Sequence, residues 1–254
     1  MTAPDADGLE SSLIEHLIEL RARLMRGVLG LAVVMVALLP FAKKLYNALA
    51  LPMVKQLPTG QTLQMIARTP TSGFFASIKL VFFIALFATM PWLLYQAWAF
   101  VAPGLYRREK KLALPLLVSS VSLFYLGCAF AYFVVLPSVF HALGAFTPDV
   151  VTLAPDPAEY LDFILVIFFA FGVSFELPVA LVILTQLGWV SPQQLSEWRG
   201  YAVVGIFVIA AVITPPDAIS QLLLAVPMCV LYELGIIASK LVARKATAEA
   251  DTAD

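Results

Sequence analysis

Residues 80–102 form one uninterrupted run without a charged side chain, and this run constrains the fold more than any other feature. A helix needs about 20 predominantly apolar residues to cross a hydrocarbon core of about 30 Å. The whole chain is 61% hydrophobic and only 13% charged, whereas soluble domains carry about 25% charged residues. The sequence therefore predicts an integral membrane protein and excludes an ordinary soluble domain.

Six apolar runs follow one another along the chain and predict an all-α membrane domain with six transmembrane helices. We place the apolar cores at residues 27–42, 80–102, 112–136, 163–187, 201–213 and 219–238. At 1.5 Å per residue the fifth run covers only about 20 Å. The last two spans are therefore predicted to be short: either polar-tolerant turns extend the apolar stretch, or the bilayer thins around this hairpin.

The ends of the chain are polar and are predicted to lie outside the membrane domain. Residues 1–12 are expected to be a flexible N-terminus, residues 13–239 the six-helix membrane domain, and residues 240–254 a flexible cytoplasmic tail. A local signal marks one helix start between the fourth and fifth spans. Ser191 is a typical N-cap, and Pro192 suits the first helical position.

Six spans place both termini on the same side of the membrane, and the basic residues indicate which side. With both termini inside, eleven of the 16 lysines and arginines fall in inner segments. The remaining five all fall in the first outer segment, residues 43–79, and the other two outer segments have none. Lysine and arginine are enriched in cytoplasmic loops of membrane proteins. Both termini are therefore predicted to lie in the cytoplasm.

Three carboxylates are the leading candidates for a functional contact, and the residues alone leave their roles open. Glu19 and Glu109 are both expected at the cytoplasmic face, where each could bind one arginine of a pair through charge-assisted hydrogen bonds. Glu19 could instead pair with Arg23 on its own helix, and Glu109 could simply be solvated among cations. Glu176 stands alone inside the fourth span, where a charge must face protein or water or be protonated.

Glu176 has three possible roles: a hydrogen bond that fastens helices together, a polar contact for a partner helix, or a proton relay. Pro178 follows it closely and is expected to bend the helix there. Three other polar residues near the last two spans are candidates for structural or functional roles. Glu233 is expected to pair with Lys240 or to snorkel, Asp217 to act first as a turn and cap residue, and Gln221 has no assigned role.

No cofactor, metal site or catalytic apparatus is expected. The two histidines lack metal-ligand spacing, and the two cysteines lie inside apolar runs without a C-x-x-C motif. The chain also lacks a zinc-type histidine pair and a G-x-S-x-G nucleophile motif. We therefore predict a protein that is not an enzyme and that has no nucleic-acid partner.

Four separated motifs, in this order and within six spans, resemble the TatC family, the multispanning component of the twin-arginine protein translocase. They are EHLIELR at residues 15–21, APGLY at 102–106 ahead of Glu109, FGVSFELP at 171–178 and TPPD at 214–217. The resemblance covers about residues 13–245. It implies a receptor in the bacterial cytoplasmic (inner) membrane that binds signal peptides bearing paired arginines.

The resemblance also implies residue roles and partners. The two signal-binding carboxylates of the family fall on Glu19 and Glu109, with Arg107 and Arg108 as the basic positions beside the second, although these arginines also suit topology determinants. Glu176 takes the place of the intramembrane acid that favours partner contact, and Asp217 that of the acid in the last outer turn. The implied partners are single-span TatA and TatB proteins, signal peptides of folded cargo, membrane lipid and further copies of the chain.

One alternative from another functional class remains at this point. A small proton-coupled secondary transporter would use Glu176 as its proton carrier and would be expected to contain inverted repeats. The sequence shows no internal repeat. The receptor of a translocase that uses the proton-motive force to export folded proteins is therefore the main prediction.

Overall fold

The computed structural model describes residues 6–46, 72–101, 113–139, 157–213 and 218–251, and within these ranges the regular structure is entirely helical. The elements in chain order are α1 (Ala6–Leu38), η1 (Leu39–Phe41), α3 (Ser72–Val101), α4 (Ala113–Phe130), η4 (Ala131–Val135), α6 (Pro157–Ser174), α7 (Leu177–Gln186), α8 (Pro192–Glu197), α9 (Arg199–Ile213) and α10 (Ala218–Asp251). The all-α prediction is confirmed. Glu109, Arg107, Arg108 and Asp217 lie outside the described residues.

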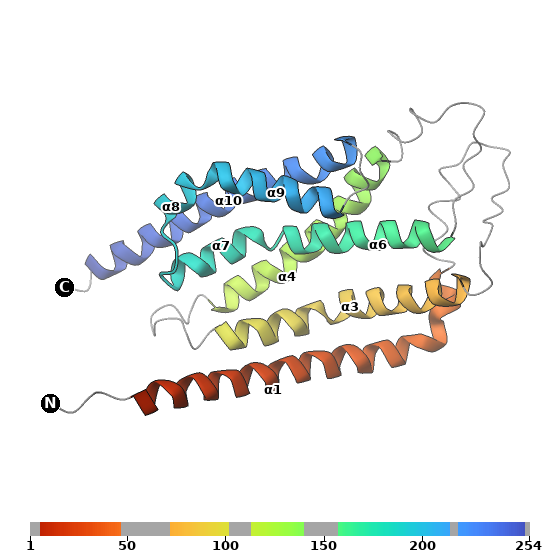
Figure 1. Cartoon of the computed structure of the whole chain (residues 1–254), viewed down its shortest axis with the longest axis horizontal. Helices are drawn as coiled ribbons and strands as arrows, with labels where there is room; N and C mark the ends of the chain where they lie inside the picture. Colours follow the sequence, from red (N-terminus) through yellow and green to blue (C-terminus); the bar gives the residue numbers. More distant parts are fainter. Residues whose placement is uncertain (1–5, 47–71, 102–112, 140–156, 214–217, 252–254) are drawn as a thin grey trace. The chain divides into compact units, whose positions relative to one another are not determined.

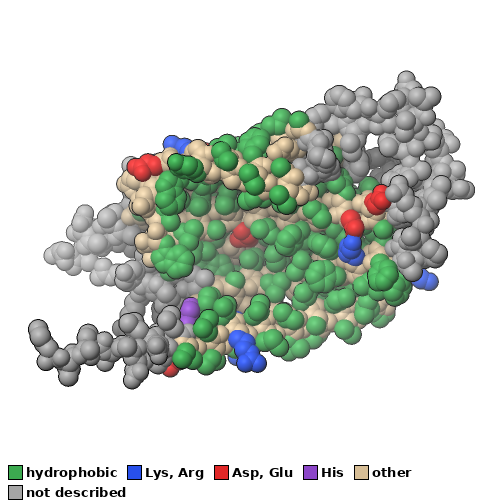
Figure 2. Space-filling view, in the orientation of Figure 1, with side chains coloured by type: hydrophobic (Ala, Val, Ile, Leu, Met, Phe, Trp, Pro, Cys, Tyr) green, Lys and Arg blue, Asp and Glu red, His purple; other side chains and the backbone are tan. Residues whose placement is uncertain are grey.

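Five helical segments in the described part of the chain are long and apolar enough to cross a membrane. They are Ile14–Tyr46, Gly73–Phe100, Leu114–Val139, Ala158–Gln186 and Gln221–Ala243, and α9 is a shorter apolar helix. Hydrophobic side chains cover most of the described surface on the face shown in Figure 2, where acidic and basic side chains are few. This surface suits lipid rather than water, because monomeric soluble proteins rarely expose large contiguous apolar patches.

The predicted short fifth span is confirmed, but the prediction for the sixth is wrong. α9 has 15 residues, whereas α10 has 34 and contains a 23-residue apolar segment. α10 is longer than its apolar run because nothing stops the helix: no glycine or proline follows Ala238. Both chain ends are also more helical than expected, since α1 begins at Ala6 and α10 continues to Asp251. Their flexibility stays a prediction.

The fourth span is one apolar segment broken into two helices, as Pro178 predicts. α6 ends at Ser174, Glu176 is the N-cap residue of α7, and Pro178 lies in the first turn of α7. Proline has no N–H to donate to the carbonyl four residues earlier, which is that of Ser174. The backbone N–H of Glu176 instead donates to Val173 O at 3.0 Å, which tightens the turn. The break therefore positions the Glu176 side chain.

The chain separates into two units, each packed around its own helices. The first unit comprises Met1–Leu57 and Ser77–Ala113 and contains α1, η1 and most of α3, which run side by side (Figure 1). The second comprises Pro58–Ala76 and Leu114–Asp254. Its core is built by α4, η4, α6, α7, α9 and α10, with Phe171, Leu224 and Ile236 among the most deeply buried side chains.

α8 begins with a capping box, which confirms the prediction made from Ser191 and Pro192. Gln194 N donates to Ser191 Oγ at 3.2 Å, and Ser191 N donates to Gln194 Oε1 at 2.8 Å. The two bonds satisfy backbone donors that the helix itself cannot satisfy. Leu195 then packs into the core, and its carbonyl accepts a hydrogen bond from the buried Tyr232 hydroxyl of α10 at 2.8 Å.

Candidate functional site

Glu19 lies on α1 and is held by Arg23 one turn later. Arg23 Nε and Nη2 both donate to Glu19 Oε1, at 2.8 and 2.5 Å. The local alternative foreseen from the i,i+4 spacing is therefore present. Both donors use Oε1, and among the described residues no hydrogen bond to the second carboxylate oxygen, Oε2, is seen. The Glu19 side chain is about one third exposed.

The surroundings of Glu19 tie α1 to α3 within the first unit. The His16 ring stacks on Phe100 of α3 with centroids 4.3 Å apart. Further along, Trp92 Nε1 of α3 donates to the carbonyl of Arg26 at 3.3 Å. Contacts on both sides of Glu19 therefore hold this part of α1 against α3, so the carboxylate is presented from a fixed helix rather than from a loop.

Glu176 lies at the break between α6 and α7 and faces α4. Ser120 Oγ of α4 donates to Glu176 Oε2 at 2.6 Å. Glu176 Oε1 is buried and has no hydrogen-bond partner among the described residues. The bond joins α4 to the break between α6 and α7, and the role of Glu176 stays a prediction. Leaving a buried carboxylate oxygen without a hydrogen bond costs free energy of folding. A further donor to Glu176 Oε1 would therefore be favourable.

Glu233 pairs with a residue other than the one predicted. Arg199 Nε donates to Glu233 Oε1 at 2.6 Å, and Arg199 Nη2 donates to Glu233 Oε2 at 2.9 Å. The prediction of a pair with Lys240 is therefore wrong, because α8 and the turn after it bring the start of α9 against α10. The bidentate pair is about half exposed and joins α9 to α10, because Arg199 is the first residue of α9 and Glu233 lies on α10.

Gln221 also joins these two helices. Its Nε2 donates to the carbonyl of Phe207 on α9 at 3.1 Å. Gln221 and Glu233 thus attach α10 to α9 at two separate levels, and both have a structural contact. Among the described residues, no cluster of three or more potential metal ligands occurs.

Sequence reasoning does not single out Ser120 or Arg199, and each proves to be the partner of a candidate residue. Ser120 is one of two adjacent serines in an apolar span, and the sequence contains no signal for which of them faces Glu176. In the sequence, Arg199 stands out only as a cation of an inner segment. Both contacts join residues far apart in the chain, so they depend on how helices cross.

Comparison with known proteins identifies the family. A family model described as "Sec-independent protein translocase protein (TatC)" matches residues 15–227. The chain belongs to the TatC family. It is 48% identical over 246 residues to the TatC protein of Halothiobacillus neapolitanus, covering 95% of this chain and 67% of that protein. It is 47% identical over 228 residues to TatC of Escherichia coli (strain K12), covering 90% of this chain and 88% of that protein.

A solved structure supports the same assignment at the level of the fold. The crystal structure described as the twin arginine translocase receptor TatC superposes with a TM-score of 0.79 at 38% identity. The match covers 90% of this chain and 99% of that one. These similarities favour the translocase over the proton-coupled transporter, the alternative that the sequence left open. The TatC family is a family of protein translocases.

Proposed function

We propose that this TatC-family protein is the signal-peptide receptor of the twin-arginine translocase and that it binds paired arginines through Glu19 and Glu109. It is a multi-pass protein of the bacterial cytoplasmic (inner) membrane. The observation that carries the residue assignment is the geometry of Glu19: Arg23 donates to Oε1, and Oε2 has no hydrogen bond among the described residues. Guanidinium and carboxylate form paired, charge-assisted hydrogen bonds, which a lysine cannot reproduce because it lacks the planar fork.

The orientation of the receptor follows from its basic residues. Eleven of the 16 lysines and arginines fall in the segments that are cytoplasmic when both termini face the cytoplasm, and this distribution supports that orientation. Arg107 and Arg108 serve primarily to fix topology in this scheme, and they border the signal-peptide site.

The chain has no catalytic role in the scheme. Folded cargo crosses with single-span TatA and TatB partners, driven by the proton-motive force, in a complex that contains several copies of the chain.

The proposed function is tested by photocrosslinking from residue 109. A photoreactive amino acid replaces Glu109 in the full chain in membrane vesicles that also contain the partner proteins. A labelled signal peptide is offered with two arginines and, separately, with two lysines. We expect an adduct with the arginine peptide at least tenfold stronger than with the lysine peptide, since Glu19 still selects the guanidinium. Equal adduct yields with both peptides would show that the chain does not distinguish arginine from lysine around residue 109, and would contradict the proposed function.

We further propose that Glu176 is a polar anchor for a partner helix. Its Oε1 is buried without a hydrogen-bond partner among the described residues, and a Ser, Thr or Gln side chain of a partner could supply the donor. α9 is short, which favours a locally thin bilayer beside the anchor. Three further polar residues lie in or next to the last two spans: Asp217, Gln221 and Glu233. The hydrogen bonds of Gln221 and Glu233 support structural roles for both.

The Glu176→Leu variant is expected to lose at least 80% of the single-span partner that copurifies with the wild-type chain. The Ser120→Ala variant removes the hydrogen bond within the chain but keeps the carboxylate, so it should retain most of the partner. Val173→Leu changes an exposed position near the end of α6 and serves as the control. If Ser120→Ala loses the partner as completely as Glu176→Leu does, Glu176 acts only by fastening α4.

A further inference from the structure

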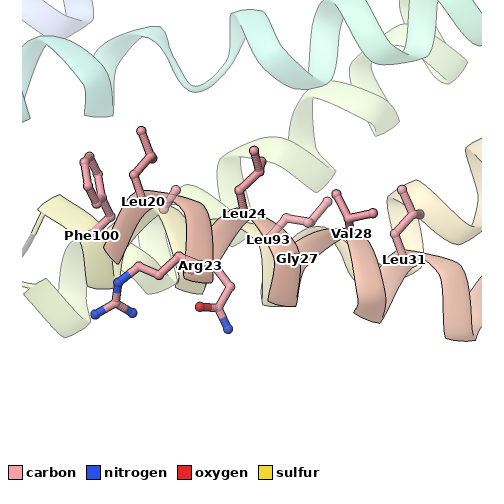
Figure 3. Close-up of a pocket in the computed structure, with 10 residues that line it drawn as sticks. Leu20, Arg23, Leu24, Gly27, Val28, Leu31, Leu93 and Phe100 are labelled. Atoms are coloured by element: carbon pink, nitrogen blue, oxygen red, sulfur yellow. The ribbon is translucent and has the colours of Figure 1, made fainter. Parts of the chain in front are cut away.

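A groove lies between α1 and α3 within the first unit, and its volume is about 310 Å³. Apolar side chains on successive turns of α1 form one wall, as Figure 3 shows: Leu20, Leu24, Val28 and Leu31. Residues of α3 form the other wall: Leu93, Gln96, Ala97 and Phe100. Leu24 and Val28 are more than half exposed, so the groove is open to the surroundings of the helices.

Glycines let the two walls approach closely, so the groove is preformed. A Cβ at Gly27 would lie 3.1 Å from Leu93 Cδ2, and one at Gly30 would lie 2.9 Å from the Trp92 ring. The Trp92 indole also donates to the Arg26 carbonyl, which holds α1 and α3 together at this level. A ligand therefore does not have to order this site before it binds.

One end of the groove lies at the depth of the lipid head groups. Residues 27–42 contain no charged side chain, so the hydrocarbon core begins beyond Arg26. Trp92 of α3 contacts the Arg26 carbonyl, and Gln96 lies one turn further toward the end of α3. Arg23 lies about one turn before Arg26, and it lines the groove together with Gln96. A ligand therefore needs polar groups at this end and hydrocarbon along the rest.

Gln96 gives the groove a buried polar atom without a partner. The residue is only 6% exposed, and its Oε1 has no hydrogen-bond partner among the described residues. Buried amide oxygens in native proteins are almost always hydrogen-bonded. An occupant that donates an O–H or N–H to Gln96 Oε1 therefore fits this groove better than hydrocarbon alone.

The dimensions of the groove match one acyl chain of a lipid. The row from Leu20 to Leu31 is about 16 Å long at 1.5 Å per residue. One leaflet supplies about half of a hydrocarbon core of about 30 Å, so an acyl chain extends about as far as this row. An apolar cavity of about 150 Å³ holds one benzene molecule, so a groove of twice that volume holds about a dozen carbons. That is most of one acyl chain.

We propose that this groove binds a phosphatidylglycerol molecule, with one acyl chain along the leucine row and the head group beside Gln96. The glycerol hydroxyls of the head group donate to Gln96 Oε1, and the phosphate accepts from arginine. Arg23 uses two of its five N–H donors for Glu19, so the others remain for the phosphate. The inference is independent of the proposed function, because it uses no contact with a signal peptide.

The charges at this end of α1 select among the phospholipids. Within residues 14–30, three arginines and two glutamates leave one excess positive charge. Phosphatidylglycerol is anionic and its donors are neutral. Phosphatidylethanolamine would place an ammonium ion beside the arginines, and the head group of phosphatidylcholine has no O–H or N–H to donate. Phosphatidylglycerol therefore satisfies both the charge and the buried amide oxygen.

Photocrosslinking from four positions of α1 tests the location. A photoreactive residue replaces Leu24 or Val28, which line the groove, or Met25 or Leu29, which do not and are similarly exposed. The full chain is reconstituted in vesicles of equal parts phosphatidylglycerol and phosphatidylcholine, and mass spectrometry identifies the lipid in each adduct. We expect about fivefold more phosphatidylglycerol than phosphatidylcholine at residues 24 and 28, and nearly equal amounts at residues 25 and 29.

Two results of this experiment would overturn the proposal. The same ratio of the two lipids at all four positions would show that the chain attracts anionic lipid generally and has no site in the groove. Adducts at residues 24 and 28 mainly with a second copy of the chain would assign the groove to contact between copies.

The Gln96→Leu variant tests the hydrogen bond to the head group. It removes the acceptor and keeps a side chain of similar size, so the preference for phosphatidylglycerol at residue 24 should fall at least threefold. The total lipid yield at residue 29 should not change, which shows that α1 is still in place. Gln193→Leu changes an exposed glutamine of α8 and should leave both values unaltered. An unchanged preference in Gln96→Leu would refute the proposal.

A second lipid mixture tests the choice of head group. Vesicles of equal parts phosphatidylglycerol and phosphatidylethanolamine are used with the photoreactive residue at position 24. We expect about fivefold more adduct with phosphatidylglycerol, because its hydroxyl donors bring no positive charge to the arginines. Equal adducts with the two lipids would show that any head group with a donor suffices, and would refute the assignment to phosphatidylglycerol.

Discussion

The Glu19→Arg variant is expected to bind a twin-arginine signal peptide more than 100-fold more weakly than the unaltered chain. A hydrogen bond to a charged group contributes about 1.5–3 kcal/mol, and each 1.4 kcal/mol or so is a factor of ten in affinity. The substitution removes such bonds to Oε2 and adds repulsion between the introduced guanidinium and the incoming cations. Fluorescence anisotropy of a labelled peptide with the purified chain in detergent measures the effect.

Two variants of the same helix show whether the loss is specific to Glu19. Glu15→Arg makes the same change of charge one turn earlier, at an exposed position, and should change affinity by less than threefold. Arg23→Gln frees Oε1 and leaves the carboxylate in place, so the peptide should bind within about fivefold of its original affinity. If Glu15→Arg weakens binding as much as Glu19→Arg does, affinity depends only on the overall charge of this end of α1, and the specific contact with Glu19 is refuted.

Features that depend on neighbouring residues could be predicted from the sequence. The capping box at Ser191 needs only residues three positions apart, and the pair of Glu19 with Arg23 needs only one helical turn. Pro178 predicted the interruption of the fourth span because a missing N–H acts within the same helix. The all-α fold followed from apolar runs alone. In each case the determining contact lies within a few residues of its partner.

Contacts between helices could not be predicted in the same way. Glu233 and Lys240 share a helix face, which made their pairing plausible, but Arg199 is the residue that pairs with Glu233 because of how α9 returns against α10. The bond from Ser120 to Glu176 depends on the crossing of α4 and the α6–α7 break. Gln96 is a polar residue in an apolar run, and the sequence does not reveal that its side chain is buried next to α1.

The Gly127→Ala variant is expected to lower the apparent midpoint of thermal unfolding by several degrees. Gly127 marks a close approach of α4 to α6: a Cβ there would lie 2.6 Å from the Phe171 carbonyl oxygen and 3.0 Å from its carbon. These are backbone atoms, which cannot turn aside as a flexible side chain can. Overpacking typically costs about 1–3 kcal/mol, which outweighs the 0.5–1 kcal/mol or so that alanine gains over glycine inside a helix.

Gly205→Ala in α9 is the matched control, because an added Cβ there meets no atom of the described residues within 4 Å. The control variant gains the helix preference of alanine without the clash, so its midpoint should stay unchanged or rise. Tryptophan fluorescence of the purified chain in detergent reports both midpoints. A Gly127→Ala midpoint equal to that of Gly205→Ala would show that α4 and α6 separate without cost. The position of Ser120 on α4 would then be loosely held, and with it the hydrogen bond that orients Glu176.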